Sequence, residues 1–487
     1  VNMTDNSSLT LGAVPTANIS VKVQRSGESW ITGTTLVTAP VGADSKITLA
    51  AAEESEFADY EFQYESDAEN VTWTINSANA GGGSGSGDGT GSEGSGGEGT
   101  NPAGNVFYVD GVVRDNADGK TAETAFKTLA EAYNAINAFN EANLDNTVAY
   151  IVVCGNVDAS DSGLISYLTI ENQTKYENTL MFPAHSGEVV LTSKIGAEDY
   201  TQAASLSFGS GKDKQYMLQG ATTFENINIS SYAKELYAGF YNLTLGDGIT
   251  GDSNLSYYPA QTVYLGFKRA KSGLSYNNDN SKASAFVMNS GKLQKFYAGT
   301  CSWTSTYSNM SVTVNGGVID TLYGTSNINS SVQSKVEITI NGGNVNKCYG
   351  VCNQVNVGGD GVTITIKKDA TVGTVSAVEP ANTDKNYVAK LNGPATLNLV
   401  GYDLSTAIPG TISDFDYMGL INSTVQIAAV WDGMTGVNMT DNSLLKFESA
   451  PSEKIEVVAF KSGDEWQTTN PLIQAPSSTA ADIFNLM

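Results

Sequence analysis

Histidine, cysteine, basic residues and long apolar runs are all scarce in this chain of 487 residues. His185 is the one histidine, and no nucleophile or acid pattern lies beside it, so we expect a loop residue and not a Ser-His-Asp or Cys-His site. A membrane-spanning helix needs about 20 consecutive apolar residues, and the sequence contains no such run. The 26 Lys and Arg stand against 51 Asp and Glu, and the net charge of −25 argues against a nucleic acid partner.

Four cysteines are present, namely Cys154, Cys301, Cys348 and Cys352. A small secreted scaffold would contain more of them. Cys348 and Cys352 have a CxxxC spacing, which does not match a zinc ribbon. The sequence therefore predicts buried free thiols, with a metal site as the alternative.

The chain contains one segment twice. Residues 1–7 recur without change as residues 437–443, and 19 of the 47 positions in 1–47 are identical in 437–483 with no gap. Agreement of this kind indicates duplication, and it predicts one full period and part of the next from a tandem array. Such an array is typical of an extended extracellular structural or adhesive protein.

Period-two alternation in residues 60–64 and 71–75 predicts β-strands near the N-terminus. Residues 81–101 include eleven glycines and no apolar side chain, which predicts a flexible linker. We divide the chain into a β-rich cap (1–78), a Gly/Ser-rich acidic linker (79–104), a strand with a capping helix (105–145), a parallel β-helix (146–436) and a truncated second cap (437–487).

A strand is expected at 106–111, followed by a polar loop and one amphipathic helix. Phe126, Leu129, Tyr133 and Ile136 have helical spacing, and the helix is expected to run to about Asn140. This arrangement resembles the N-terminal cap of right-handed parallel β-helix proteins of the pectate-lyase-like superfamily. The resemblance implies the fold but no particular activity, because enzymes and non-catalytic surface proteins share it.

The loop before that helix is rich in oxygen ligands. Asp110, Asp115, Asn116 and Asp118 together suit a calcium ion, which prefers hard oxygen donors. A turn in which Asx side chains bond their own backbone is the alternative. Calcium is the one cofactor that the sequence suggests.

A regular repeat marks the middle of the chain. Residues 312–317 (VTVNGG) recur as 338–343 (ITINGG), and related segments stand at 286–291 and 364–367. Coils of this length hold three short strands, and stacked coils pair them in parallel about 4.8 Å apart. The fold class predicted is thus all-β, a right-handed parallel β-helix with a coil period of about 26 residues, a capping helix and β-rich terminal caps.

Stacked coils bring equivalent side chains into ladders. Asn289, Asn315 and Asn341 are expected to bond one another along the axis. A second ladder is expected from Tyr297, Tyr323 and Tyr349, either as structural stacking or as an exposed sugar platform.

An enzyme of this fold would need a basic residue or paired carboxylates on one coil face. Arg269 is the sole arginine of the solenoid, and Asp320 is expected to stack on Asn346 and then Val372, which leaves no acidic column. Three further carboxylates, which nothing in the sequence ties into one site, could serve a hydrolase: Asp247, Asp252 and Asp279. No catalytic residue is predicted.

The coils resemble those of giant cell-surface β-helix proteins of gut-type Gram-positive bacteria. That resemblance implies a non-catalytic structural or adhesive repeat unit of an extracellular surface fibre, with copies of itself as partners, joined head to tail through the duplicated termini. The alternatives are a polysaccharide lyase or hydrolase, and a module that binds host or plant glycans through Tyr257, Tyr258 and Trp303.

Overall fold

The structure is a computed structural model, and its description covers the greater part of the chain. The described residues are 2–4, 9–11, 19–24, 34–40, 47–51, 60–66, 70–77, 105–143, 148–161, 163–166, 179–209, 214–267, 284–301, 310–327, 330–332, 335–353, 355–357, 360–382, 388–428, 431, 433–440, 443–449, 455–460, 472–474 and 484–486. The linker expected over 79–104 lies outside them. The chain divides into two compact units, 1–96 and 97–487.

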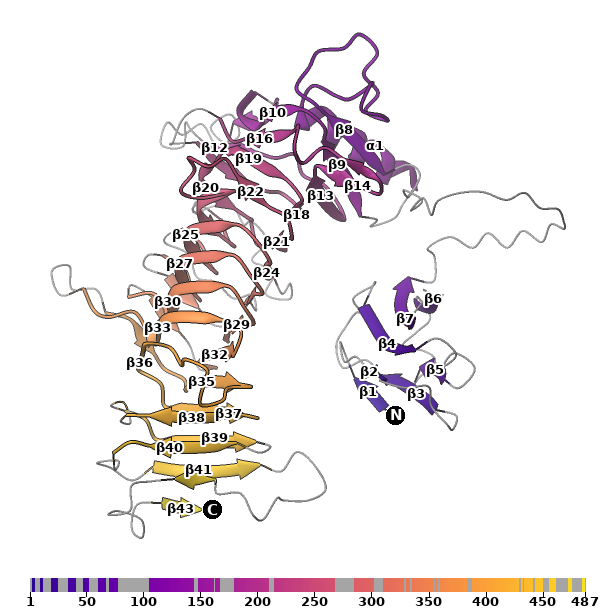
Figure 1. The fold of residues 1–487 in the computed structure, drawn as a ribbon. Helices are drawn as coiled ribbons and strands as arrows, with labels where there is room; N and C mark the ends of the chain where they lie inside the picture. Colours follow the sequence, from indigo (N-terminus) through magenta and orange to yellow (C-terminus); the bar gives the residue numbers. More distant parts are fainter. Residues whose placement is uncertain are drawn as a thin grey trace. The chain divides into compact units, whose positions relative to one another are not determined.

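The second unit is a parallel β-helix, which confirms the predicted fold class (Figure 1). Its first face, sheet 1, has 14 strands, all parallel. They are β8 (Val106–Val109), β9 (Ala149–Val153), β13 (Glu188–Thr192), β18 (Ala221–Glu225), β21 (Leu243–Leu245), β24 (Ser284–Met288), β26 (Met310–Val314), β29 (Val336–Ile340), β32 (Val362–Lys367), β35 (Ala395–Val400), β37 (Tyr417–Ile421), β39 (Gly436–Thr440), β41 (Ile455–Phe460) and β43 (Phe484–Leu486).

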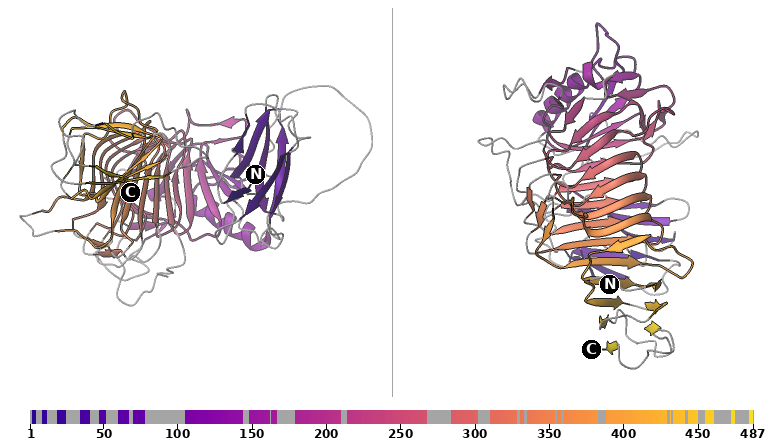
Figure 2. Two further views of the ribbon diagram at one scale, coloured as in Figure 1. Left: turned by 90° about the horizontal axis from the view of Figure 1, so that it is seen from below. Right: turned by 90° about the vertical axis from the view of Figure 1, so that its left-hand side faces the viewer.

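Sheet 2 forms the opposite wall with 10 strands, parallel except where β11 meets β12. They are β11 (Ile165–Ser166), β12 (Thr179–Met181), β17 (Gln215–Met217), β20 (Ala233–Tyr237), β23 (Ala260–Tyr264), β25 (Lys292–Tyr297), β27 (Val318–Tyr323), β30 (Asn344–Val351), β33 (Thr371–Val378) and β36 (Thr411–Ser413). Figure 2 shows the strands as successive rungs of one stack.

Shorter sheets complete the coils. They are β10 (Asn156–Asp158), β16 (Ser205–Ser207), β19 (Asn228–Ser231) and β22 (Thr250–Gly251); β28 (Ser330–Val332), β31 (Val355–Val357) and β34 (Lys390–Leu391); β38 (Thr424–Ile427), β40 (Leu444–Phe447) and β42 (Ile473–Gln474). A small hairpin of β14 (Lys194–Ile195) and β15 (Glu198–Asp199) and a 3-10 turn, η3 (Ala159–Asp161), lie near the N-terminal end of the solenoid.

Alternating side chains build the core. In β26, β29 and β32 the buried positions carry Val, Ile or Met and the intervening ones carry Ser, Thr or Glu, as a half-buried strand requires. Val312 pairs with Ile338 and Ile338 with Ile364, so each of these coils advances the chain by one period of the sequence repeat. Buried branched side chains therefore form continuous columns along the solenoid axis.

The number of residues between paired positions of successive coils differs elsewhere in the solenoid. The predicted stacking of Asn346 on Val372 is therefore wrong. Between β30 and β33 the register advances by one residue more than the repeat, because Val345 pairs with Val372 and Lys347 with Thr374. Asn346 thus lies beside Gly373, where an added Cβ would collide with the Asn346 carbonyl oxygen, and not beside Val372. The extra residue does not change the consequence, since the position after Asp320 and Asn346 still carries no carboxylate.

Both expected ladders form. Asn315 donates its amide to Asn289 over 2.9 Å, and Asn341 donates to Asn315 over 2.7 Å. The tyrosine ladder runs further than predicted, because Tyr237 and Tyr264 precede Tyr297 with ring centroids 5.0 Å apart at each step. Its rings are at least nine-tenths buried, which favours structural stacking over a sugar platform.

Replacing Asn315 by alanine removes two ladder bonds at once. We expect the free energy of unfolding of the central coils to fall by about 1 kcal/mol. The loss is small for two hydrogen bonds because Asn315 is exposed, so water replaces part of the lost bonding. Urea unfolding followed by circular dichroism measures the change. Alanine at the neighbouring outward position Thr313 is the control, and an equal loss in both variants would contradict a specific role for the ladder.

The capping helix is α1 (Leu129–Asn143), with Thr128 and Glu131 forming a capping box at its start. The prediction that Phe126 belongs to this helix is wrong. Its backbone instead bonds to Tyr108 and Asp110 on the edge of β8, so Phe126 behaves as a strand residue. The helix packs Tyr133 edge-to-face on Phe182 and covers the N-terminal end of the core.

The first unit has a small core of its own. A parallel sheet holds β1 (Asn2–Thr4), β3 (Ile19–Gln24) and β5 (Ile47–Ala51). A second sheet holds β2 (Leu9–Thr10), β4 (Thr34–Pro40), β7 (Asn70–Ser77) and β6 (Tyr60–Ser66), in which β6 and β7 form an antiparallel hairpin on β4. Val21, Leu36, Val37 and Trp73 are buried.

Candidate functional site

The first two coils of the repeated segment have the same strand pairing in both copies. Thr4 pairs with Gln24 in the first copy, and their counterparts Thr440 and Phe460 pair in the second. Leu9 likewise pairs with Val37, and their counterparts Leu445 and Ile473 pair with each other. The sequence duplication is therefore also a duplication of two solenoid coils, and we take these coils as the candidate functional site.

In the second copy the coils sit directly on the preceding solenoid turn. Met418 and Leu420 of β37 pair with Val437 and Met439 of β39, and all four side chains are buried. On the adjoining face Val425 of β38 pairs with Leu445 of β40. The strands of the second cap thus extend both sheets beyond residue 436.

Two buried serines join these turns at the corner. The Ser443 hydroxyl accepts a hydrogen bond from the Ser423 backbone N–H over 3.1 Å and donates to the Leu420 carbonyl over 3.0 Å. Ser423 makes the same kind of contact with the turn above, donating to the Leu399 carbonyl over 2.9 Å. Because buried hydroxyls and backbone groups need partners, this ladder fixes the corner of each coil. It was not predicted from the sequence, although Ser423 and Ser443 each follow a strand of sheet 1 closely.

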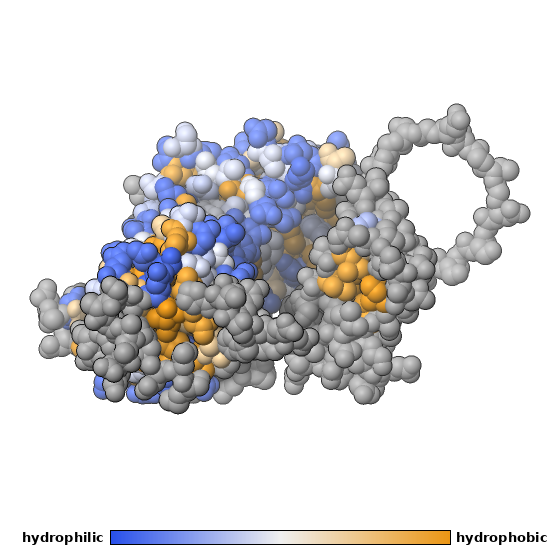
Figure 3. Space-filling view, turned by 60° about the horizontal axis from the view of Figure 1, so that its bottom comes forward, coloured by the Kyte–Doolittle hydropathy of each residue, from blue (hydrophilic) through white to orange (hydrophobic). Residues whose placement is uncertain are grey.

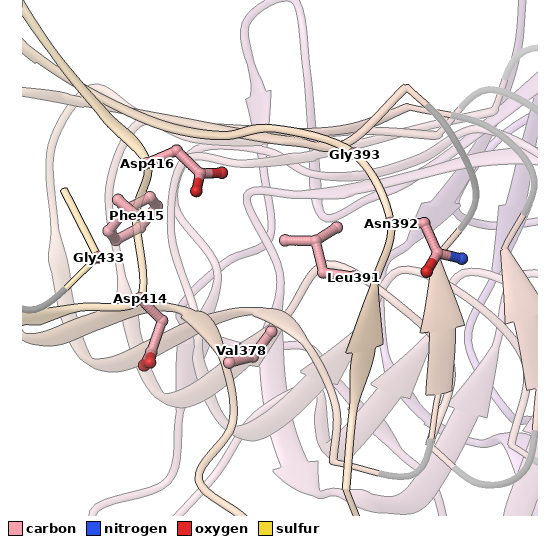
Figure 4. Close-up of a pocket in the computed structure, with 8 residues that line it drawn as sticks. All are labelled: Val378, Leu391, Asn392, Gly393, Asp414, Phe415, Asp416 and Gly433. Atoms are coloured by element: carbon pink, nitrogen blue, oxygen red, sulfur yellow. The ribbon is translucent and has the colours of Figure 1, made fainter. Parts of the chain in front are cut away.

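A cavity of about 370 Å³ lies beside the same turns (Figure 4). Its lining is Val378, Leu391, Asn392, Gly393, Asp414, Phe415, Asp416 and Gly433. The Asp414 carboxylate accepts from the Ser376 hydroxyl over 2.7 Å, and Asp416 accepts from the Ala395 backbone N–H over 2.7 Å. Neither carboxylate was predicted as a site residue; the Asp-Phe-Asp run at 414–416 was the available signal.

The charged groups that line the cavity, the carboxylates of Asp414 and Asp416, can only accept hydrogen bonds. No His, Lys or Arg is among the residues that line it. Asp416 also binds the turn before β39 through its backbone carbonyl, which accepts from Thr435 and Gly436. Both carboxylates are therefore tied to structural partners, and Phe415 is buried in the core.

Two of the four residues of the predicted calcium site, Asp110 and Asp118, contact their own loop. Asp110 forms an ion pair with Arg114 and accepts from the Val112 backbone N–H. Asp118 accepts from the Lys120 backbone N–H, and the pKa of its carboxyl is lowered, first by a hydrogen bond from the Thr124 side chain. Asp115 and Asn116 are exposed. Within the described ranges no group of three His, Cys, Asp or Glu side chains is arranged to hold a metal ion, and the calcium site stays a prediction.

His185 and the cysteines are structural in their contacts. The His185 ring packs on Tyr133 with centroids 5.4 Å apart, in the loop between β12 and β13. No disulfide joins the four cysteines, and Cys348 and Cys352 are buried, which confirms the buried thiols expected at these two positions. Burial raises the pKa of the Cys348 thiol, so this side chain is a core residue and not a nucleophile.

The carboxylates considered for a hydrolase and the aromatic residues considered for glycan binding each contact different residues. Asp252 accepts from the Asn228 amide, whereas Asp247 lies near Glu225, whose pKa is raised first by burial and then by Asp247 and Glu188. Tyr257 donates to Asp320, and the Tyr258 ring packs over Gly251. Asp279, Arg269 and Trp303 lie outside the described residues.

Among the described residues no helix is both long and apolar enough to cross a membrane. The comparisons with known proteins add no relative: no family model, no curated protein and no solved structure matches this chain.

Proposed function

We propose that this chain is a non-catalytic structural or adhesive repeat unit of an extracellular bacterial surface fibre, and that it associates end to end through its duplicated coils. The observation that carries the proposal is the identical strand register of the pairs β1–β3 and β2–β4 in the first copy and β39–β41 and β40–β42 in the second. The same two coils thus occur before the solenoid in the sequence and again after its turn of β37 and β38. Units of this kind concatenate naturally.

The rest of the molecule supports a structural role. Tyrosine and asparagine ladders and the aliphatic columns fill the coils with groups that stabilise the stack. The described cavity beside the repeated coils has no Lys, Arg or His among its lining residues, and its two carboxylates, Asp414 and Asp416, are engaged by Ser376 and the Ala395 backbone. A head-to-tail contact between different ends is heterologous, so it extends into fibres and does not close into rings.

Electron microscopy and analytical ultracentrifugation of the purified chain test the proposal. We expect filaments with a regular axial repeat and a mass that rises with concentration. The control is Val21→Asp, which places a charge in the buried core of the first unit and leaves the solenoid sequence intact. Assembly is expected to be lost in this variant. A wild-type chain that remains monomeric at high concentration, or filaments that persist in Val21→Asp, would contradict association through the duplicated coils.

A further inference from the structure

Asparagine is followed by glycine at three places in the chain, at 315–316, 341–342 and 392–393. This dipeptide is chemically labile, because glycine has no side chain to shield its backbone nitrogen. That nitrogen can attack the side-chain amide of the asparagine before it. The three pairs share one sequence, so any difference in their reactivity comes from the fold.

At the coil corners the reacting groups are already bonded. The Asn315 amide donates to the Asn289 side chain over 2.9 Å. The Gly316 backbone N–H donates to the Met288 carbonyl over 3.1 Å. The corner at 341–342 repeats both bonds one coil later, with the backbone bond at 3.3 Å. Both bonds must break before the nitrogen can reach the amide carbon, so the folded coil protects these two pairs.

The third pair has neither restraint. Asn392 and Gly393 form the corner between β34 and β35 and line the described cavity. Among the described residues neither the Asn392 amide nor the Gly393 N–H has a hydrogen-bond partner. Exposure does not separate the sites, because the Asn392 and Asn315 side chains are both exposed. In the view of Figure 4 Asn392 lies on the side of the cavity opposite Asp414 and Asp416.

We infer that Asn392 is a site of spontaneous deamidation in the folded protein, and that the asparagine ladder protects the two identical dipeptides at the coil corners. The Gly393 nitrogen bonds to the Asn392 Cγ, and the side-chain amide nitrogen leaves with the glycine proton as ammonia. Water then opens the cyclic imide at either carbonyl and yields aspartate or isoaspartate. Water is the sole co-reactant. Hydrophilic side chains, blue in Figure 3, cover much of the described solenoid surface in that view, and water reaches the exposed Asn392 directly.

Both products change the corner and the cavity. The neutral amide becomes a carboxylate, which joins Asp414 and Asp416 around one cavity, and like charges that share a site repel one another. Isoaspartate also carries the main chain through the former side chain and so lengthens the backbone. This happens next to the bond from the Asn392 N–H to the Val357 carbonyl, 3.2 Å long, which holds the corner on the preceding coil. We expect β34 and the start of β35 to exchange their amide hydrogens faster as the protein ages.

Peptide mass spectrometry of the aged full chain tests the inference. One sample is kept folded at neutral pH, and a second is kept in urea as the unfolded reference. In urea we expect all three asparagines to convert at similar rates. In the folded sample Asn392 is expected to convert, whereas Asn315 and Asn341 should be slower by more than about tenfold, because two hydrogen bonds must open first. An Asn392 that stays intact in the folded chain while it converts in urea would overturn the inference, and equal rates at all three sites would overturn protection by the ladder.

Gly393→Ser is the matched variant. It keeps Asn392 and places a side chain beside the attacking nitrogen, so less acid should form at position 392 than in the wild type. The comparison in urea is independent of whether the variant folds. Conversion at the wild-type rate in Gly393→Ser would show that the Gly393 nitrogen is not the nucleophile, and would overturn the proposed chemistry.

Discussion

Replacing Phe296 by alanine is expected to lower the free energy of unfolding of the central coils by about 3–5 kcal/mol. Phe296 of β25 is fully buried, and its ring stacks on Phe286 of β24 with centroids 4.0 Å apart. The two rings join sheet 1 to sheet 2 across the interior. Val263 and Leu322 lie on either side of Phe296 in the strand register, and both are fully buried. Alanine would leave a cavity that these neighbours can fill only in part.

The loss should be local, because each turn of a solenoid contacts only its neighbours. Urea unfolding together with hydrogen exchange of the segments around β23, β25 and β27 measures it. Lys295→Ala, one residue earlier and only half-buried, is the control and is expected to change stability by less than about 0.5 kcal/mol. Uniform loss of protection along every strand of sheet 1 would contradict local stacking as the source of stability.

The sequence predicts the solenoid because its coils repeat the same local pattern. Alternating Val, Ile and Thr with an Asn-Gly-Gly corner appears at a fixed interval, so the ladder of Asn289, Asn315 and Asn341 could be read without coordinates. The tyrosine ladder was found for the same reason. The fixed interval does not extend the predicted ladder to Tyr237 and Tyr264, because Tyr264 pairs with Tyr297 across a coil that is longer than the repeat.

Insertions and single-residue shifts limit what a repeat can predict. The longer step that brings Gly373 beside Asn346 follows from one extra residue in the preceding coil, and nothing in the local pattern marks it. Phe126 has helical spacing relative to Leu129 and Tyr133, yet tertiary pairing with β8 decides its conformation. The cavity at Asp414 and Asp416 arises between turns of unequal length, which a sequence pattern does not describe.

Lowering the pH from 7 to 5 is expected to destabilise the N-terminal end of the solenoid through His185. Burial lowers the pKa of this imidazole from 6.5 to about 4. Neither ring nitrogen has a hydrogen-bond partner among the described residues, and the ring lies between Tyr133 and the backbone of Gly220. The folded state therefore holds His185 neutral, whereas the unfolded chain binds a proton below about pH 6.5.

Because the unfolded chain binds this proton more readily than the folded protein, the free energy of unfolding falls as the pH falls. The contribution of neutral His185 is fully present above about pH 6.5 and is lost as the pH falls toward 4, at about 1.4 kcal/mol per pH unit, so about 2 kcal/mol is gone at pH 5. Urea unfolding at several pH values, with hydrogen exchange in α1 as the local probe, measures the slope. His185→Phe keeps an aromatic ring and removes the titration, so its stability should vary less between pH 7 and 5 even if its absolute value is lower. Equal slopes in the two proteins would show that carboxylates alone set the acid sensitivity, because His185 is the one histidine of the chain.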